Sequence, residues 1–127
     1  MRLRCVIVDD SPPVLRAASD LLAREGMDVV GVAATGEQAM KLMRSLQPDL
    51  LLIDIDLGAE SGLELARRVA DSSYAVSCCT VLMSTYDEAD FASLIATSPA
   101  IGFVAKSELS AAAIHELVER AQAEGGS

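Results

Sequence analysis

The sequence predicts an α/β fold in which a doubly wound, five-stranded parallel sheet, with strand order 2-1-3-4-5, is covered by five helices. Short apolar segments alternate with segments of helical periodicity along the whole chain. Residues 50–57 form an apolar run that is uninterrupted up to Asp54, as is typical of a parallel strand buried on both faces. The 127 residues, 51% of them hydrophobic, predict one domain at residues 1–123 and a flexible tail at residues 124–127.

Five strands are expected from the apolar runs and from the turn residues that bound them. They are residues 3–8, 29–34, 50–54, 79–83 and 101–105. Because each strand is followed by a segment with helical spacing, the crossovers between parallel strands are expected to be right-handed.

The first two helices have clear signals at both ends. Ser11 and the two prolines that follow it open a helix, and Gly26 closes that helix as a C-terminal cap would. Thr35 caps the second helix, which ends at the break formed by residues 47–49.

The other three helices are predicted from apolar residues at helical spacing. The residues expected to face inward are Leu63, Ala66, Val69 and Ala70 in the third helix, Phe91, Leu94 and Ile95 in the fourth, and Ile114, Leu117, Val118 and Ala121 in the fifth. The fourth helix is expected at residues 87–97, before Pro99, and Ser110 is expected to cap the fifth.

The charge and the cysteine content limit the classes of partner. Nineteen acidic and ten basic residues give a net charge of -9, which repels nucleic acids and anionic membranes. Cys5, Cys78 and Cys79 form no disulfide framework, and no apolar run approaches the roughly 18 residues of a membrane span. We therefore expect a cytoplasmic protein that binds neither nucleic acid directly nor a membrane.

Polar side chains stand at the carboxyl ends of four predicted strands. They are Asp9, Asp10, Asp54, Ser84 and Lys106. The predicted strand order brings these ends to one edge of the sheet, where ligands bind in open α/β folds. Three carboxylates at one edge repel one another and need a cation, and without a nearby cysteine or histidine the preferred ion is Mg²⁺.

The same set of residues is suited to a phosphoryl group. The hydroxyl of Ser84 and the charge of Lys106 can stabilise phosphoryl oxygens beside the cation. An ionised Asp54 can accept the phosphoryl group as an acyl phosphate, because aspartate is an established nucleophile in such steps. The loop after the first strand has no glycine-rich fingerprint, so a dinucleotide site is not expected.

Four motifs stand at strand ends, in the order Val8-Asp9-Asp10-Ser11, Leu52-Ile53-Asp54-Ile55-Asp56-Leu57, Met83-Ser84-Thr85 and Gly102-Phe103-Val104-Ala105-Lys106. Together they resemble the receiver domain of response regulators in two-component signalling, over nearly the whole chain. The resemblance implies a flavodoxin-like fold and a phospho-accepting switch rather than a turnover enzyme. It also implies either a stand-alone regulator or the receiver of a helix-turn-helix regulator.

The resemblance further implies roles for the acidic residues. Asp54 would take a phosphoryl group from a histidine kinase or a phosphotransfer protein. Asp10 and Asp54 would bind Mg²⁺ together with the backbone carbonyl of Asp56, and Asp9 would help mainly through water.

Other residues would bind the phosphoryl group or respond to it. Ser84 and Lys106 would bind its oxygens, and a shift of one residue would give the role of Ser84 to Thr85. Phe103 would rotate inward and change the face of the fourth helix, fifth strand and fifth helix, which would contact a downstream protein partner or a second copy in a homodimer.

The chain departs from the family pattern at several places, among them Ser84 where threonine is commoner and Thr85 where a small residue is usual. Gly58-Ala59 stands where the family usually has Pro-Gly, Ser107 follows Lys106 where proline is common, and Phe103 has no hydroxyl. Asp56 and Tyr86 occupy positions that tune the lifetime of the phosphoryl group in the family.

Two other functions are open at this point. Residues 53–56 resemble the Asp-x-Asp motif of haloacid-dehalogenase-type phosphatases, although in that family the acidic metal pair follows the lysine rather than preceding the nucleophile. The altered loop at Gly58-Ala59 is also compatible with a degenerate receiver that binds a partner without phosphorylation.

Overall fold

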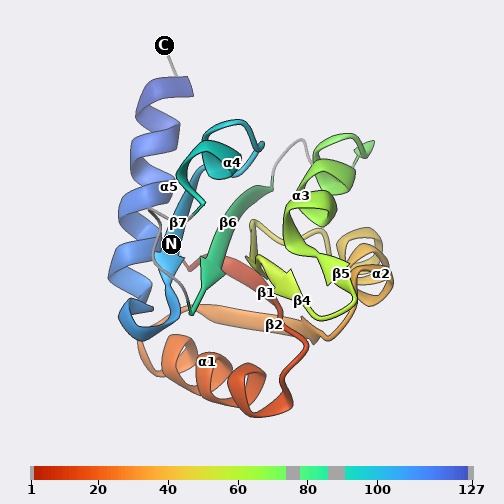
Figure 1. Ribbon diagram of the computed structural model, residues 1–127. Coiled ribbons are helices and arrows are strands. Elements are labelled where there is room, and N and C mark those ends of the chain that lie inside the picture. Colours follow the sequence, from red (N-terminus) through yellow and green to blue (C-terminus); the bar gives the residue numbers. More distant parts are fainter. Residues whose placement is uncertain (1, 74–77, 86–90, 126–127) are drawn as a thin grey trace.

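The protein is built around a parallel sheet with helices on both faces (Figure 1). The computed structural model describes residues 2–73, 78–85 and 91–125. The strands of the sheet follow the order β2-β1-β3-β6-β7, so the predicted order 2-1-3-4-5 is confirmed. Their bounds are β1 Arg4–Val8, β2 Asp28–Ala33, β3 Leu50–Asp54, β6 Cys79–Ser84 and β7 Gly102–Ala105.

Five α-helices connect or follow these strands in the described part of the chain. They are α1 Pro12–Arg24, α2 Gly36–Leu46, α3 Gly62–Ala70, α4 Ala92–Ala96 and α5 Ala111–Gly125. A single 3₁₀ turn, η3 Lys106–Glu108, follows β7. Among the described residues, no helix is long and apolar enough to cross a membrane.

The N-terminal caps of α1 and α2 form where the sequence predicts them, and Ser61 caps α3, for which no cap is predicted. The side chains of Ser11, Thr35 and Ser61 accept hydrogen bonds from backbone N–H groups in the first turns of α1, α2 and α3, which satisfies donors that have no partner within a helix. Gln47 ends α2 in a left-handed conformation, with φ of 45°, directly before Pro48. Gly26 has φ of 97° and ends α1 in the same way.

The core consists of two apolar layers, one on each face of the sheet. Ile7 on β1 packs with α1 and α5, whereas its neighbour Val8 packs with α2 and α3. This alternation follows from the two-residue period of a strand. All five residues of β3 are buried, which confirms the prediction of a central strand covered on both faces.

A small antiparallel hairpin follows β3 where the sequence predicts only a loop. Its strands are β4 Asp56–Leu57 and β5 Glu60–Ser61, in which Asp56 pairs with Ser61. The chain turns at Gly58, which has φ of 74°, and Leu57 is buried against the α2 and α3 face. The hairpin therefore fixes the course of the chain immediately after Asp54.

Two expected inward-facing residues are exposed, and the last helix is longer than predicted. Ala70 is exposed, and Leu65 is the buried residue of α3 that the spacing missed. Leu94 is 47% exposed on α4, which has five residues; positions 87–90 of the predicted helix lie outside the described residues. Glu124 lies in α5 rather than in the predicted tail.

Candidate functional site

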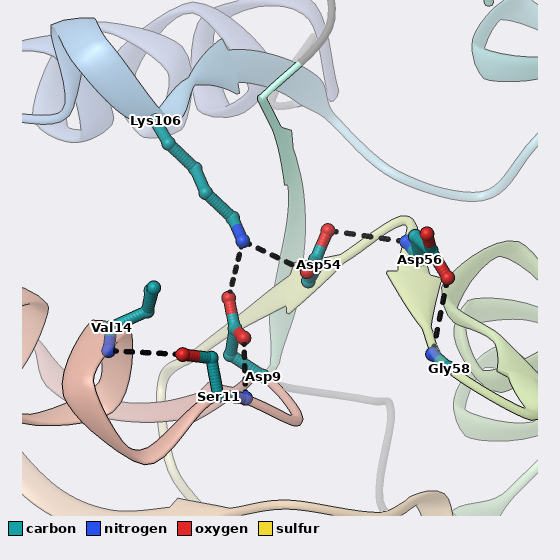
Figure 2. A network of polar contacts seen from close by, with 7 residues as sticks. All are labelled: Asp9, Ser11, Val14, Asp54, Asp56, Gly58 and Lys106. Atoms are coloured by element: carbon teal, nitrogen blue, oxygen red, sulfur yellow. Dashed lines mark hydrogen bonds and ion pairs between the residues drawn. The ribbon is translucent and has the colours of Figure 1, made fainter.

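The predicted polar residues stand at the carboxyl edge of the sheet, at the ends of four adjacent strands. Asp9 follows β1, Asp54 ends β3, Ser84 ends β6 and Lys106 follows β7. The parallel registers align these ends, since Asp54 pairs with Met83 and Ser84 with Ala105. Figure 2 shows Lys106 reaching across the edge toward Asp9 and Asp54.

Lys106 forms ion pairs with two carboxylates at once. Its Nζ atom lies 2.6 Å from Oδ2 of Asp9 and 2.9 Å from Oδ2 of Asp54. The side chain of Asp9 is fully buried and that of Asp54 is 7% exposed, whereas that of Lys106 is 17% exposed. One partly buried cation therefore faces two buried anions, so the described cluster keeps an excess of negative charge.

The burial of the cluster changes the pKa values of Asp54 and Lys106. Burial raises the pKa of Asp54, and the charge of Asp9 adds to this effect; the hydrogen bonds from Lys106 and from the backbone of Asp56 oppose it without cancelling it. For Lys106, burial lowers the pKa, but the hydrogen bonds and charges of Asp9 and Asp54 together outweigh burial and raise it. At neutral pH, Lys106 is therefore charged. Ionisation of Asp54 costs the folded protein free energy, because burial disfavours the charged form.

The second oxygen of each buried carboxylate accepts a backbone hydrogen bond. Oδ1 of Asp9 accepts from the N–H of Ser11 at 2.9 Å, and Oδ1 of Asp54 accepts from the N–H of Asp56 at 3.1 Å. Asp56 in turn accepts from the N–H of Gly58 at 3.1 Å (Figure 2). These bonds fix the two buried carboxylates in the orientation in which they meet Lys106.

Asp10 completes a group of three carboxylates. One oxygen from each of Asp9, Asp10 and Asp54 lies within 4.8 Å of the others, and Asp10 is exposed to solvent. Hard oxygen donors in this number suit Mg²⁺, which takes one or two carboxylates and keeps several waters. The excess negative charge and the exposed side chain of Asp10 fit an ion that enters from solvent.

The other predicted residues occupy different surroundings. Ser84 is buried at the end of β6, whereas Thr85 is exposed and lines an apolar groove between α1 and the turn at η3. Phe103 is half-buried and packs on the α2 and α3 face of the sheet, near Phe91 and Ile95. Tyr86 lies outside the described residues.

Two glycines next to the site have steric surroundings that the sequence does not reveal. A Cβ atom at Gly62 would overlap the carbonyl oxygen of Asp54, and a Cβ atom at Gly58 would lie 2.8 Å from Oδ2 of Asp10. Glu60 is a further residue that the sequence pattern misses; its carboxylate accepts from the N–H of Gly36 at 3.2 Å and ties the hairpin to α2. The sequence shows glycine at these positions, but not which atoms would meet a side chain there.

The fold and the composition of this edge define the class of protein: an α/β signal receiver with an acidic cluster and a lysine at the carboxyl ends of its strands. The family model described as the response regulator receiver domain matches residues 5–119. The chain therefore belongs to the response regulator receiver domain family of two-component systems, as the motifs predicted.

Individual relatives agree with this assignment. The response regulator GacA of Pseudomonas aeruginosa is 30% identical over 118 residues, which are 92% of this chain and 52% of GacA. The DNA-binding response regulator MtrA of Mycolicibacterium smegmatis is 35% identical over 88 residues, 68% of this chain and 38% of MtrA. The chain thus spans about half the length, or less, of these relatives.

A solved structure shows the same fold. The signal receiver domain of the response regulator NarL from Mycobacterium tuberculosis superposes with a TM-score of 0.77 at 26% identity. The match covers 91% of this chain and 96% of the NarL domain.

Replacing Asp54 with asparagine is expected to stabilise the protein at pH 7, by about 1 kcal/mol, because it removes one of two buried anions that share a single lysine. The pKa of Asp54 is raised in the folded state, so the folded protein binds a proton more readily than the unfolded chain does. The free-energy cost of the ionised Asp54 in the folded protein is thus fully present above the folded pKa, and it is lost as the pH falls through that pKa. Urea unfolding of both proteins from pH 7 down to about pH 4, near the ordinary pKa of aspartate, should show a gain that shrinks on acidification. A gain that grows would contradict the assignment.

Proposed function

We propose that this chain is a phospho-accepting switch, in which Asp54 takes a phosphoryl group from a phosphohistidine of a histidine kinase or a phosphotransfer protein. The observation that carries the proposal is the position of the Asp54 carboxylate: it ends the central strand, 2.9 Å from the Nζ atom of Lys106 and within the acidic cluster. Membership of the receiver family supports the same function.

In the transfer step, a carboxylate oxygen of Asp54 attacks the phosphorus atom. The new O–P bond makes an acyl phosphate, the N–P bond breaks, and the electron pair of that bond stays with the histidine of the donor. The backbone N–H of Asp56 and the Nζ atom of Lys106 each donate to one oxygen of Asp54 and hold its carboxylate in place, so little rearrangement is needed before attack.

The acidic residues would hold Mg²⁺ beside the reacting oxygen. Asp10 and Asp54 are the proposed carboxylate ligands, with the backbone carbonyl of Asp56, and Asp9 contributes mainly through water. The ion, when bound, neutralises the charge that develops on the phosphoryl oxygens. The ionised Asp54 would also gain from it, because a cation offsets the repulsion by Asp9 that contributes to its raised pKa.

Lys106 and Ser84 would bind the transferred group. Lys106 is already charged and lies against the acceptor carboxylate, so it can transfer its hydrogen bonds to phosphoryl oxygens. Ser84 ends β6 beside β3 and is the proposed hydroxyl donor; its burial favours it over the exposed Thr85.

The readout would be a change of the surface formed by α4, β7 and α5. Phe103 lies on β7, within this surface, where its half-buried side chain lines a pocket between α4 and α5. The proposed partners at this surface are a downstream protein or a second copy of the chain. The output is thus a change of binding rather than turnover of a substrate, and we place the switch in the cytoplasm, where its free cysteines stay reduced.

Chemical mapping of the acceptor tests this proposal. The protein is incubated with phosphoramidate and Mg²⁺, and then treated with borohydride, which reduces an acyl phosphate to an alcohol and so converts aspartate to homoserine. We expect homoserine at position 54 alone. Homoserine at Asp9, Asp10 or Asp56 instead, or at no position, would contradict the assignment of Asp54.

A further inference from the structure

We propose that Gly58 is a positioning residue for the metal site: the absence of a side chain there allows the carboxylate of Asp10 to lie within the acidic cluster. This inference rests on the proposed function, because it concerns the same Mg²⁺ site. Gly58 lies in the turn of the β4–β5 hairpin and, as a glycine, offers no side-chain ligand atom of its own.

The steric argument starts from the distance between Gly58 and Asp10. A Cβ atom built on Gly58 would lie 2.8 Å from Oδ2 of Asp10 and 3.8 Å from its Cγ atom. Contacts between carbon and oxygen below about 3.0 Å are repulsive, so one of the two groups would have to move. The carboxylate is the end of an exposed side chain, whereas Gly58 is held in a hairpin. Asp10 would therefore rotate away from Asp9 and Asp54.

Two features fix the backbone conformation of Gly58. Its φ of 74° lies in the left-handed region that favours glycine. Its N–H donates to Oδ1 of Asp56 at 3.1 Å, and Asp56 is paired with Ser61 across the hairpin. A proline at this position could supply neither the positive φ nor the donor. The turn thus holds the Cα atom of Gly58 against Asp10.

The chain offers a matched control for the strain of a side chain at positive φ. Gly26 has φ of 97°, and a Cβ atom there would meet no atom within 4 Å. Gly26→Ala therefore introduces backbone strain alone, whereas Gly58→Ala introduces strain and the conflict with Asp10. Gly26→Ala therefore controls for the strain that a side chain causes at positive φ.

Mg²⁺ binding, measured by isothermal titration calorimetry on the full chain, tests the proposal. We expect Gly58→Ala to weaken Mg²⁺ binding by about tenfold, comparable with the loss of a group that orients a metal ligand. Gly26→Ala should stay within about twofold of the wild type. Equal affinities for all three proteins, or an equal loss in both variants, would overturn the proposal.

Two further variants separate the contact with Asp10 from a general loss of folding or of hairpin geometry. Gly58→Asn keeps a Cβ atom but tolerates positive φ better than alanine, so it decides the matter if Gly58→Ala does not fold. In an Asp10→Asn background, Gly58→Ala should cause no further loss of affinity, because the two changes act through the same carboxylate. An additional tenfold loss in that background would show that Gly58 acts by another route and would overturn the inference.

The outcome also separates this inference from the proposed function. If the wild type binds no Mg²⁺ and accepts no phosphoryl group at Asp54, the proposed function fails and the inference fails with it. If the wild type does both, and Gly58→Ala binds Mg²⁺ as Gly26→Ala does, only the role of Gly58 is overturned.

Discussion

Replacing Gly62 with alanine is expected to lower the free energy of unfolding by about 3 kcal/mol or more. The added Cβ atom would overlap the carbonyl oxygen of Asp54 and lie 2.9 Å from the Cα atom of Ile55. Both are backbone atoms next to the central strand, and the N–H of Gly62 donates to the carbonyl of Ile55 at 2.7 Å. The conflict can be relieved only by moving α3 away from β3, which would also displace Asp54.

Gly36 is the matched control for this substitution. Gly36 and Gly62 are both buried first residues of a helix that follows a hydroxyl cap. A Cβ atom at Gly36 would lie 2.7 Å from Oε1 of Glu60, which is the end of a flexible side chain. We expect Gly36→Ala to change stability by less than about 1 kcal/mol, partly because alanine favours the helix. Urea unfolding followed by circular dichroism measures both, and equal losses would contradict the steric account.

Replacing Lys106 with methionine is expected to destabilise the protein by about 2 kcal/mol at pH 7, because the change leaves the buried carboxylates of Asp9 and Asp54 without their shared cation. Removing one partner of a fully buried ion pair costs more, but the side chain of Lys106 is 17% exposed, so water reduces the loss. The same variant is expected to lose most of its ability to accept a phosphoryl group, because the main positive side chain at the acceptor is absent.

The stability that Lys106 contributes is expected to depend on pH. The pKa of Lys106 is raised in the folded state, so its contribution is fully present below the pKa of the unfolded chain and is lost as the pH rises through the folded value. The difference between wild type and Lys106→Met should therefore shrink in alkaline solution. Lys41→Met is the control: Lys41 pairs with Glu37 at 3.7 Å on the surface, and its loss should change stability by less than about 0.5 kcal/mol. A comparable loss in both variants would contradict the central position assigned to Lys106.

The sequence predicts the features that depend on local pattern and on strand order. The five strands are visible as apolar runs, and the doubly wound order then places the ends of β1, β3, β6 and β7 side by side. Asp9, Asp54 and Lys106 can therefore be predicted to meet, although they are far apart in the chain. The sequence does not give the distances between these side chains, which the structure shows as ion pairs of Lys106 with both carboxylates.

Other features depend on contacts that no periodicity encodes. Strands of two residues, such as β4 and β5, are too short to show alternation, so the sequence predicts only a loop after Asp54. The constraints on Gly58 and Gly62 come from Asp10 and Asp54, whose atoms approach only in the folded chain. Leu94 has the spacing of a core residue, but a helix of five residues leaves it 47% exposed.

The central claim is that Asp54 accepts a phosphoryl group in a reaction that needs Mg²⁺. Its most direct test is the intact mass of the wild type and of Asp54→Asn after incubation with acetyl phosphate, with Mg²⁺ or with EDTA. The account predicts the addition of one phosphoryl group to the wild type with Mg²⁺, and no addition with EDTA or in the variant. A wild type that gains no mass under any condition, or a variant that gains the same mass, would contradict it.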